Sequence, residues 1–263
     1  MEKIKKIASI KREKKSNFME WNNNILVSSI KKINLNIVII VILDAVFYLL
    51  SGYLVVFWLR RVQEKMAAFN MPANILALGP QGAQQLVSEV KAFYFLIIFS
   101  FIVLLLAIIF LASILKGIIW AKTTGTKINF KLISRFFGLN LIWMSFWFAL
   151  ILLISLFVVP PSAPAFMAAT VILGFYFTNT LYTIFMEKYN LKSIISTVKL
   201  NITKIHLFLL PYSIISLLFY VLIKINNLFK FRYSDILFGL ILLVYAAVLR
   251  YYISTLVSAI EKS

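Results

Sequence analysis

The chain has 263 residues, of which 62% are hydrophobic and 14% are charged, and its formal net charge is +18 at pH 7. A soluble globule of this size cannot bury so much apolar surface, because its exterior must be largely polar. The composition therefore excludes an ordinary soluble domain and indicates a lipid environment. A cysteine count of zero excludes disulfides and a cysteine nucleophile, and a single histidine disfavours a histidine-based metal site.

Residues 1–33 are predicted to form a basic amphipathic arm. Beyond Ser16, the side chains of Phe18, Trp21 and Ile25 recur at helical spacing. This pattern is typical of an interfacial helix whose apolar side chains lie in the headgroup layer. A solvated tail that only sets the topology is the alternative interpretation. Six basic side chains are the candidates for contact with anionic lipid headgroups. They are Lys11, Arg12, Lys14, Lys15, Lys31 and Lys32.

Six stretches of the chain are long and apolar enough to cross a bilayer, which takes roughly 20 residues in a helix. Each is predicted to be helical, because lipid cannot satisfy an exposed backbone and the alternating pattern of barrel strands does not appear. We therefore predict an all-α, polytopic integral membrane protein with six transmembrane helices arranged as three hairpins over residues 34–257, followed by a tail at 258–263. The predicted spans are residues 34–59, 92–115, 136–159, 164–186, 205–223 and 235–257.

Positive charge is distributed unevenly between the two sides of such a chain. Twenty of the 27 Lys and Arg residues fall in the arm, in residues 116–135 and 187–204, and near the C-terminus, and the other seven fall on the opposite side. The positive-inside rule then predicts that both termini are cytoplasmic. Heavy use of Lys, Ile and Asn is typical of an AT-rich microbial genome, so we expect the cytoplasmic membrane of a prokaryote. The outer segment 60–91 is expected to lie on the interface or to cap the bundle.

Two charged side chains interrupt the apolar spans. Asp44 lies in the first span and Arg250 in the sixth, roughly 15 Å and roughly 12 Å above the inner boundary at about 1.5 Å per residue. No other cation falls at this depth in the predicted spans. Because each charge alone costs about 2.5–3.5 kcal/mol to insert, we predict an intramembrane ion pair between Asp44 and Arg250 that joins the first and last helices. A protonatable carboxylate on an ion path is the functional alternative, and contact with water, another polar side chain or a partner subunit is the third.

A second polar feature lies on the fourth predicted span. Tyr176, Asn179, Thr180, Thr183 and Glu187 are spaced by three and four residues or neighbour one another, so they fall on one polar bundle face. The structural interpretation is hydrogen bonding between helices inside a bundle. The functional alternative is a polar crevice for permeation or substrate.

Motifs of familiar enzymes are absent from the sequence. It contains no G-x-S-x-G, H-E-x-x-H, Walker A or Rossmann fingerprint. We therefore expect no catalytic residues, no cofactor and no metal site. Nucleic acid is not an expected partner either, because the basic excess of a membrane protein reports topology and anionic lipid. The expected partners are the lipid bilayer and a protein subunit or a second copy of the chain.

Three functions remain open at this point. The first is a non-catalytic subunit or scaffold of a membrane assembly, favoured by the scarcity of charged residues in the spans. The second is a permease or channel component for a small solute, ion or lipid, with a polar path near Asp44, Arg250 and residues 179–187. A lipid-acting enzyme ranks third. An accessible cavity lined by those polar residues favours transport, whereas a dry, closed bundle favours the scaffold.

Overall fold

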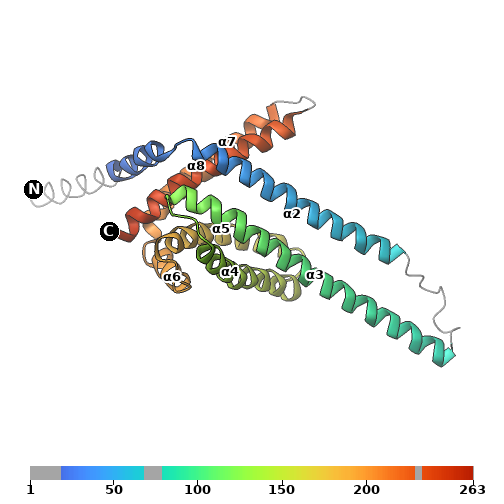
Figure 1. The fold of residues 1–263 in the computed structure, drawn as a ribbon. Helices are drawn as coiled ribbons and strands as arrows, with labels where there is room; N and C mark the ends of the chain where they lie inside the picture. The colour runs from blue at the N-terminus through green and yellow to red at the C-terminus, as the bar shows by residue number, and fades with distance from the viewer. Residues whose placement is uncertain (1–18, 68–78, 229–232, 263) are drawn as a thin grey trace, which may run out of the picture.

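The computed structural model describes residues 19–67, 79–228 and 233–262 of the chain. These residues are mostly helical, contain no strand, and include six helices long and apolar enough to cross a membrane (Figure 1). The predicted all-α class with six membrane-spanning helices is thereby confirmed. A further helix at residues 19–32 is called the arm helix below. The remaining helices are α2 (Asn36–Ala67), α3 (Gly79–Thr124), α4 (Phe130–Phe157), α5 (Ala163–Lys188), α6 (Ser193–Thr203), α7 (Ile205–Leu228) and α8 (Ser234–Lys262).

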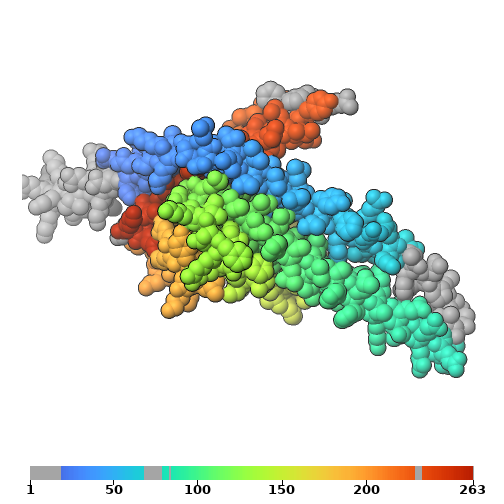
Figure 2. Space-filling view, viewed as in Figure 1, coloured from blue at the N-terminus to red at the C-terminus, as the bar shows by residue number. Residues whose placement is uncertain are grey.

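The helices α2 and α3 are longer than their predicted spans and pack along each other. The 46 residues of α3 extend about 69 Å, more than twice the roughly 30 Å thickness of a hydrocarbon core. Figure 2 shows the two helices projecting together beyond the others. Most of segment 60–91 is therefore helix, and the expectation of an interfacial or capping loop is wrong for its described part. Arg60 and Arg61 both pair with Glu64 at 3.2 Å on this projection.

A buried polar cluster joins α3, α4 and α5. The side-chain amide of Asn140 donates through Nδ2 to Ser113 Oγ at 3.0 Å, and its Oδ1 accepts from the Tyr182 hydroxyl at 2.6 Å. Ser113 in turn donates to the Ile109 carbonyl at 2.6 Å. All three polar side chains are buried. Because both ends of the amide are satisfied, the cluster favours one register among the three helices.

The segment 187–204, predicted as a loop, contains the short helix α6. Its buried side chains are Ser193, Thr197 and Asn201, which are four residues apart and so lie on one face. This helix packs on α5. The exposed residues Ile195, Val198 and Ile202 recur at helical spacing, so the sequence has the pattern of an amphipathic helix, but here the polar face is the buried one.

The arm helix packs partly on the bundle. Ile25 is 5% exposed and belongs to a core cluster that includes Ile253 and Leu256 of α8, and Trp21 packs against this cluster. The expectation that Trp21 and Ile25 lie in the headgroup layer is therefore wrong, because the apolar face of the arm helix packs against the cluster that contains α8. Lys31 and Lys32 are exposed. The other four basic residues proposed for lipid contact, Lys11, Arg12, Lys14 and Lys15, lie outside the described residues.

The Asn140 cluster gives a test of the packing. Asn140→Ala removes both side-chain bonds and leaves the Tyr182 hydroxyl without its acceptor, so we expect a loss of about 1 kcal/mol or more in unfolding free energy. Unfolding by SDS in mixed micelles measures this loss. Asn227→Ala, an exposed asparagine of α7, serves as the matched control and should change stability little. Equal effects at the two positions would contradict the structural role of the cluster.

Candidate functional site

A carboxylate with no exposed surface lies where α2, α3 and α8 meet. Asp44 of α2 is 0% exposed, and its Oδ1 accepts a hydrogen bond from Lys116 Nζ of α3 at 2.6 Å. Its Oδ2 forms an ion pair with the guanidinium of Arg250 on α8. The structure thus brings together the two charges that depth alone had matched. It also adds a second cation, so that three helices meet at one buried acid.

Lys116 corrects the sequence-based account, in which Arg250 is the only cation at the depth of Asp44. The predicted second span stops at residue 115, but α3 continues to Thr124 and places Lys116 two turns inside its end. The apolar run from Gly117 to Ala121 was the signal that the helix continues past the lysine. A prediction that ends a span at the first charged residue omits a charged residue that is buried in the bundle, as Lys116 is.

Aromatic rings hold the ammonium of Lys116 from a second direction. Its Nζ lies 4.5 Å from the ring centroid of Phe47 and 4.6 Å from that of Tyr48, both on the turn of α2 that follows Asp44. Such cation–π contacts are strongest where the cation is desolvated. The lysine is therefore positioned by α2 both through its charge and through its ring contacts.

A cavity of about 590 Å³ opens beside this cluster, within the roughly 300–1,000 Å³ range of ligand pockets. Side chains of α2, α3, α4, α5 and α8 line it. Both Lys116 and Arg250 are in its wall, whereas Asp44 lies behind them and is not. The remainder of the wall is mainly aliphatic and aromatic, including Trp143 and Trp147. The cavity is therefore an apolar chamber with two cations at one place in its wall.

The polar face predicted on the fourth span is largely used for packing. The Thr180 hydroxyl donates to the Tyr176 carbonyl at 3.3 Å, and the Thr183 hydroxyl donates to the Asn179 carbonyl at 3.0 Å, both within α5. The hydroxyl of Tyr176 donates to the carbonyl of Asn201 on α6 at 3.2 Å. Thr180 and Thr183 thus form hydrogen bonds within α5, and Tyr176 connects α5 to α6. None of these three residues lines the cavity.

The other two members of that face have separate surroundings. Asn179 is 7% exposed and is the one residue of the predicted five that lines the cavity. Glu187 lies at the end of α5 and accepts a hydrogen bond from the Ser258 hydroxyl of α8 at 2.6 Å. The neighbouring Lys188 forms an ion pair with Glu261. Glu187 therefore belongs to a contact between the ends of α5 and α8, and not to the cavity.

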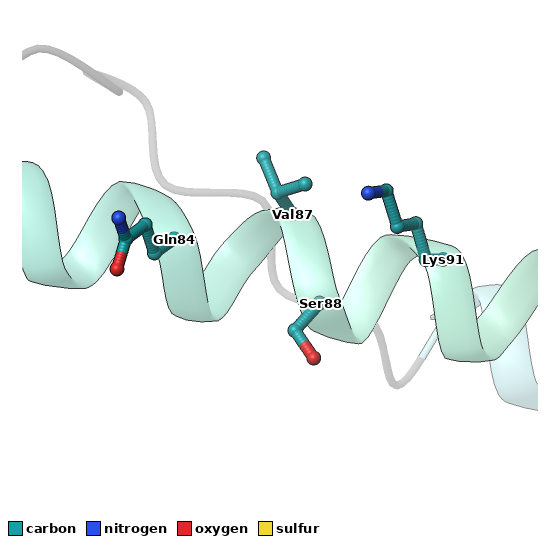
Figure 3. Close-up of a pocket in the computed structure, with 4 residues that line it drawn as sticks. All are labelled: Gln84, Val87, Ser88 and Lys91. Carbon is teal, nitrogen blue, oxygen red and sulfur yellow. The ribbon is translucent and has the colours of Figure 1, made fainter.

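A second hollow of about 440 Å³ lies on the projecting part of α3 and is lined by Gln84, Val87, Ser88 and Lys91. In Figure 3 all four side chains come from this one helix, with Val87 and Lys91 pointing to one side and Ser88 to the other. Val87 and Lys91 are exposed. A chemical site needs convergent groups from packed elements, and this hollow has none among its lining residues.

Comparison with known proteins does not assign a chemistry to this site. No family model, curated protein or solved structure matches the chain. Within the described ranges, no group of three or more His, Asp or Glu side chains lies together as a metal ion would need. The function must therefore be inferred from the Asp44 cluster and the cavity beside it.

The charge balance of the cluster predicts an order of tolerance to substitution. Asp44→Asn leaves two cations facing each other inside the bundle, and we expect it to cost about 3–5 kcal/mol of unfolding free energy. Lys116→Gln leaves the Asp44–Arg250 pair intact and should cost much less. Folded yield after detergent extraction and SDS unfolding both measure this order.

An exposed acid on α8 provides the control for this series. Asp235→Asn removes one negative charge at the start of that helix and should leave folded yield near that of the wild type. If Asp44→Asn were as harmless as Asp235→Asn, or if Lys116→Gln were the more damaging of the cluster variants, the assigned balance of charges would be wrong.

Proposed function

We propose that this chain is a non-catalytic membrane transport protein, a permease or a component of one, that admits a solute to the cavity beside Asp44. The observation that carries the proposal is the cavity of about 590 Å³ with Lys116, Arg250 and Asn179 in its wall. Ionisable groups at membrane depth are costly and mark substrate or ion pathways when they border a space that a solute can enter. If the ion pair served only to hold the helices of a scaffold together, no cavity beside it would be needed.

The proposed role places the chain in the cytoplasmic membrane of a prokaryote, with both termini inside. The support is the excess of Lys and Arg on one side, twenty against seven along the sequence. Lys116 and Arg250 both belong to the membrane part, and moving the two out of the cytoplasmic count leaves the excess unchanged in sign. The exposed Lys31 and Lys32 of the arm then face anionic headgroups.

A scaffold or subunit role is the second candidate, and one observation favours it. The helix α7 packs mainly on α6 and α8, and its outward side chains, such as Leu209 and Leu217 at 61% exposure each, have no partner among the described residues. Lipid covers such a face without further help, because acyl chains are as apolar as leucine. A scaffold role gives no function to the cavity, and we therefore rank transport first.

The transport proposal is tested by thiol accessibility, for which this cysteine-free chain is a ready background. Ser145 is an exposed residue of α4 that lines the cavity. In membrane vesicles, we expect Ser145→Cys to react with a charged, membrane-impermeant thiol reagent from both sides, because a transport cavity must open to each. Mass spectrometry of the labelled chain reports the extent of reaction.

Ser216→Cys is the matched control for this measurement. Ser216 is exposed in the middle of α7 but does not line the cavity, so its thiol should face lipid and stay unlabelled. If Ser145→Cys were protected to the same degree as Ser216→Cys, the cavity would be closed to solute and the scaffold role would take precedence.

The orientation has its own test. Ser88 lies on the projecting part of α3 and Thr203 lies at the end of α6, and both are exposed. With both termini inside, Ser88→Cys should react with the impermeant reagent in intact cells, and Thr203→Cys should react only in inside-out vesicles. The reverse pattern would invert the topology.

A further inference from the structure

The cavity wall has an imbalance of charge. Two cations, Lys116 and Arg250, are in contact with one carboxylate, and the acid is the member that lies out of reach behind them. Among the described residues, no other carboxylate pairs with either cation. A formal charge of +1 is therefore left next to an apolar chamber at membrane depth, where an unpaired charge is costly.

The wall also has more hydrogen-bond donors than the protein uses. An ammonium carries three N–H groups and a guanidinium five, but each cation forms one hydrogen bond to Asp44. Spare donors and spare positive charge both call for a ligand group with anionic oxygen atoms.

The length and the mainly apolar lining of the cavity fit a hydrocarbon chain. Its lining residues on α3 run from Ile102 to Trp120, a length of about 27 Å along the helix axis. Lys116 lies near one end of this run, and the other end is lined by apolar side chains such as Leu105 of α3 and Phe148 and Ile151 of α4. The two cations thus lie near one end of a long, mainly apolar cavity, as the charged head group and the acyl chain of an amphiphile require.

We propose that the cavity binds a single-chain anionic amphiphile, whose carboxylate or phosphate head contacts Lys116 and Arg250 and whose acyl chain extends along α3 toward Ile102. The proposal rests on the proposed function in that it names the solute class of the same cavity. An anionic head group neutralises the positive charge that Asp44 alone leaves on the two cations. The acyl chain of the ligand covers the apolar walls and removes their surface from water. Asp44 keeps the two cations close together, so that one head group reaches both.

Tryptophan fluorescence makes this testable in the full-length protein, because Trp120, Trp143 and Trp147 all line the cavity. The probes share one bromine-labelled acyl chain, since bromine quenches indole emission on contact. They are the free carboxylate, the corresponding single-chain phosphate, the uncharged methyl ester and the cationic amine. We expect saturable quenching by the carboxylate, the phosphate or both, and about tenfold weaker binding of the ester and the amine. The stronger of the two anions identifies the source of the head group.

Two lysines of the same helix complete the design. Lys116→Gln should weaken anion binding about tenfold, while Lys91→Gln, an exposed position outside the cavity, should bind like the wild type. Thermal unfolding checks that both variants are folded. Equal quenching by the ester, amine and anions, or an unchanged affinity in Lys116→Gln, would overturn the proposal.

The outcome is separable from that of the transport test. If Ser145→Cys reacts from both sides but the anions show no preference, the cavity carries a different solute and only the ligand class is wrong. If the anions bind through Lys116 while Ser145→Cys stays protected, the amphiphile is a resident structural lipid and the transport role is wrong.

Discussion

The burial of one carboxylate constrains the rest of this molecule. Asp44 has no exposed surface and takes its hydrogen bonds from cations on α3 and α8, so its placement fixes how the first, second and last membrane helices meet. Breaking a buried ion pair from one side leaves an uncompensated charge, which is far costlier than never having buried the pair. The acid is buried at the depth of Arg250 and Lys116, and both side chains contact it there.

This arrangement also explains why a cavity beside the cluster is tolerated. The buried Asn140 amide, bonded to α3 and α5, and the cluster around Asp44 hold the helices from two sides, so the chamber between them does not need its own packing to stay open. The walls are mainly apolar, and besides the two cations they include a few uncharged polar side chains such as Asn179 and Ser145. Several lining residues, such as Ile102 and Phe175, are exposed, so the cavity opens at the surface of the bundle.

Much of the architecture follows from local properties of the sequence, and the errors follow from non-local ones. Hydropathy and helical rise identify six spans and the common depth of Asp44 and Arg250, since each depends on a few consecutive residues. The predicted second span ends at residue 115, directly before the charge of Lys116, although the free-energy cost of burying that charge is offset by Asp44, 72 positions away. The burial of Ile25 against α8 and of Asn201 on α6 likewise depends on tertiary neighbours that no local pattern encodes.

The central claim is that one carboxylate holds two cations at the wall of the cavity. The most direct measurement is magic-angle-spinning NMR of the ¹³C,¹⁵N-labelled protein in lipid bilayers, detecting dipolar coupling between the Asp44 carboxyl carbon and the side-chain nitrogens of Lys116 and Arg250. We expect this carbon to couple to side-chain nitrogens of both residues in the same sample. Coupling to only one of them, or to neither, would contradict the claim.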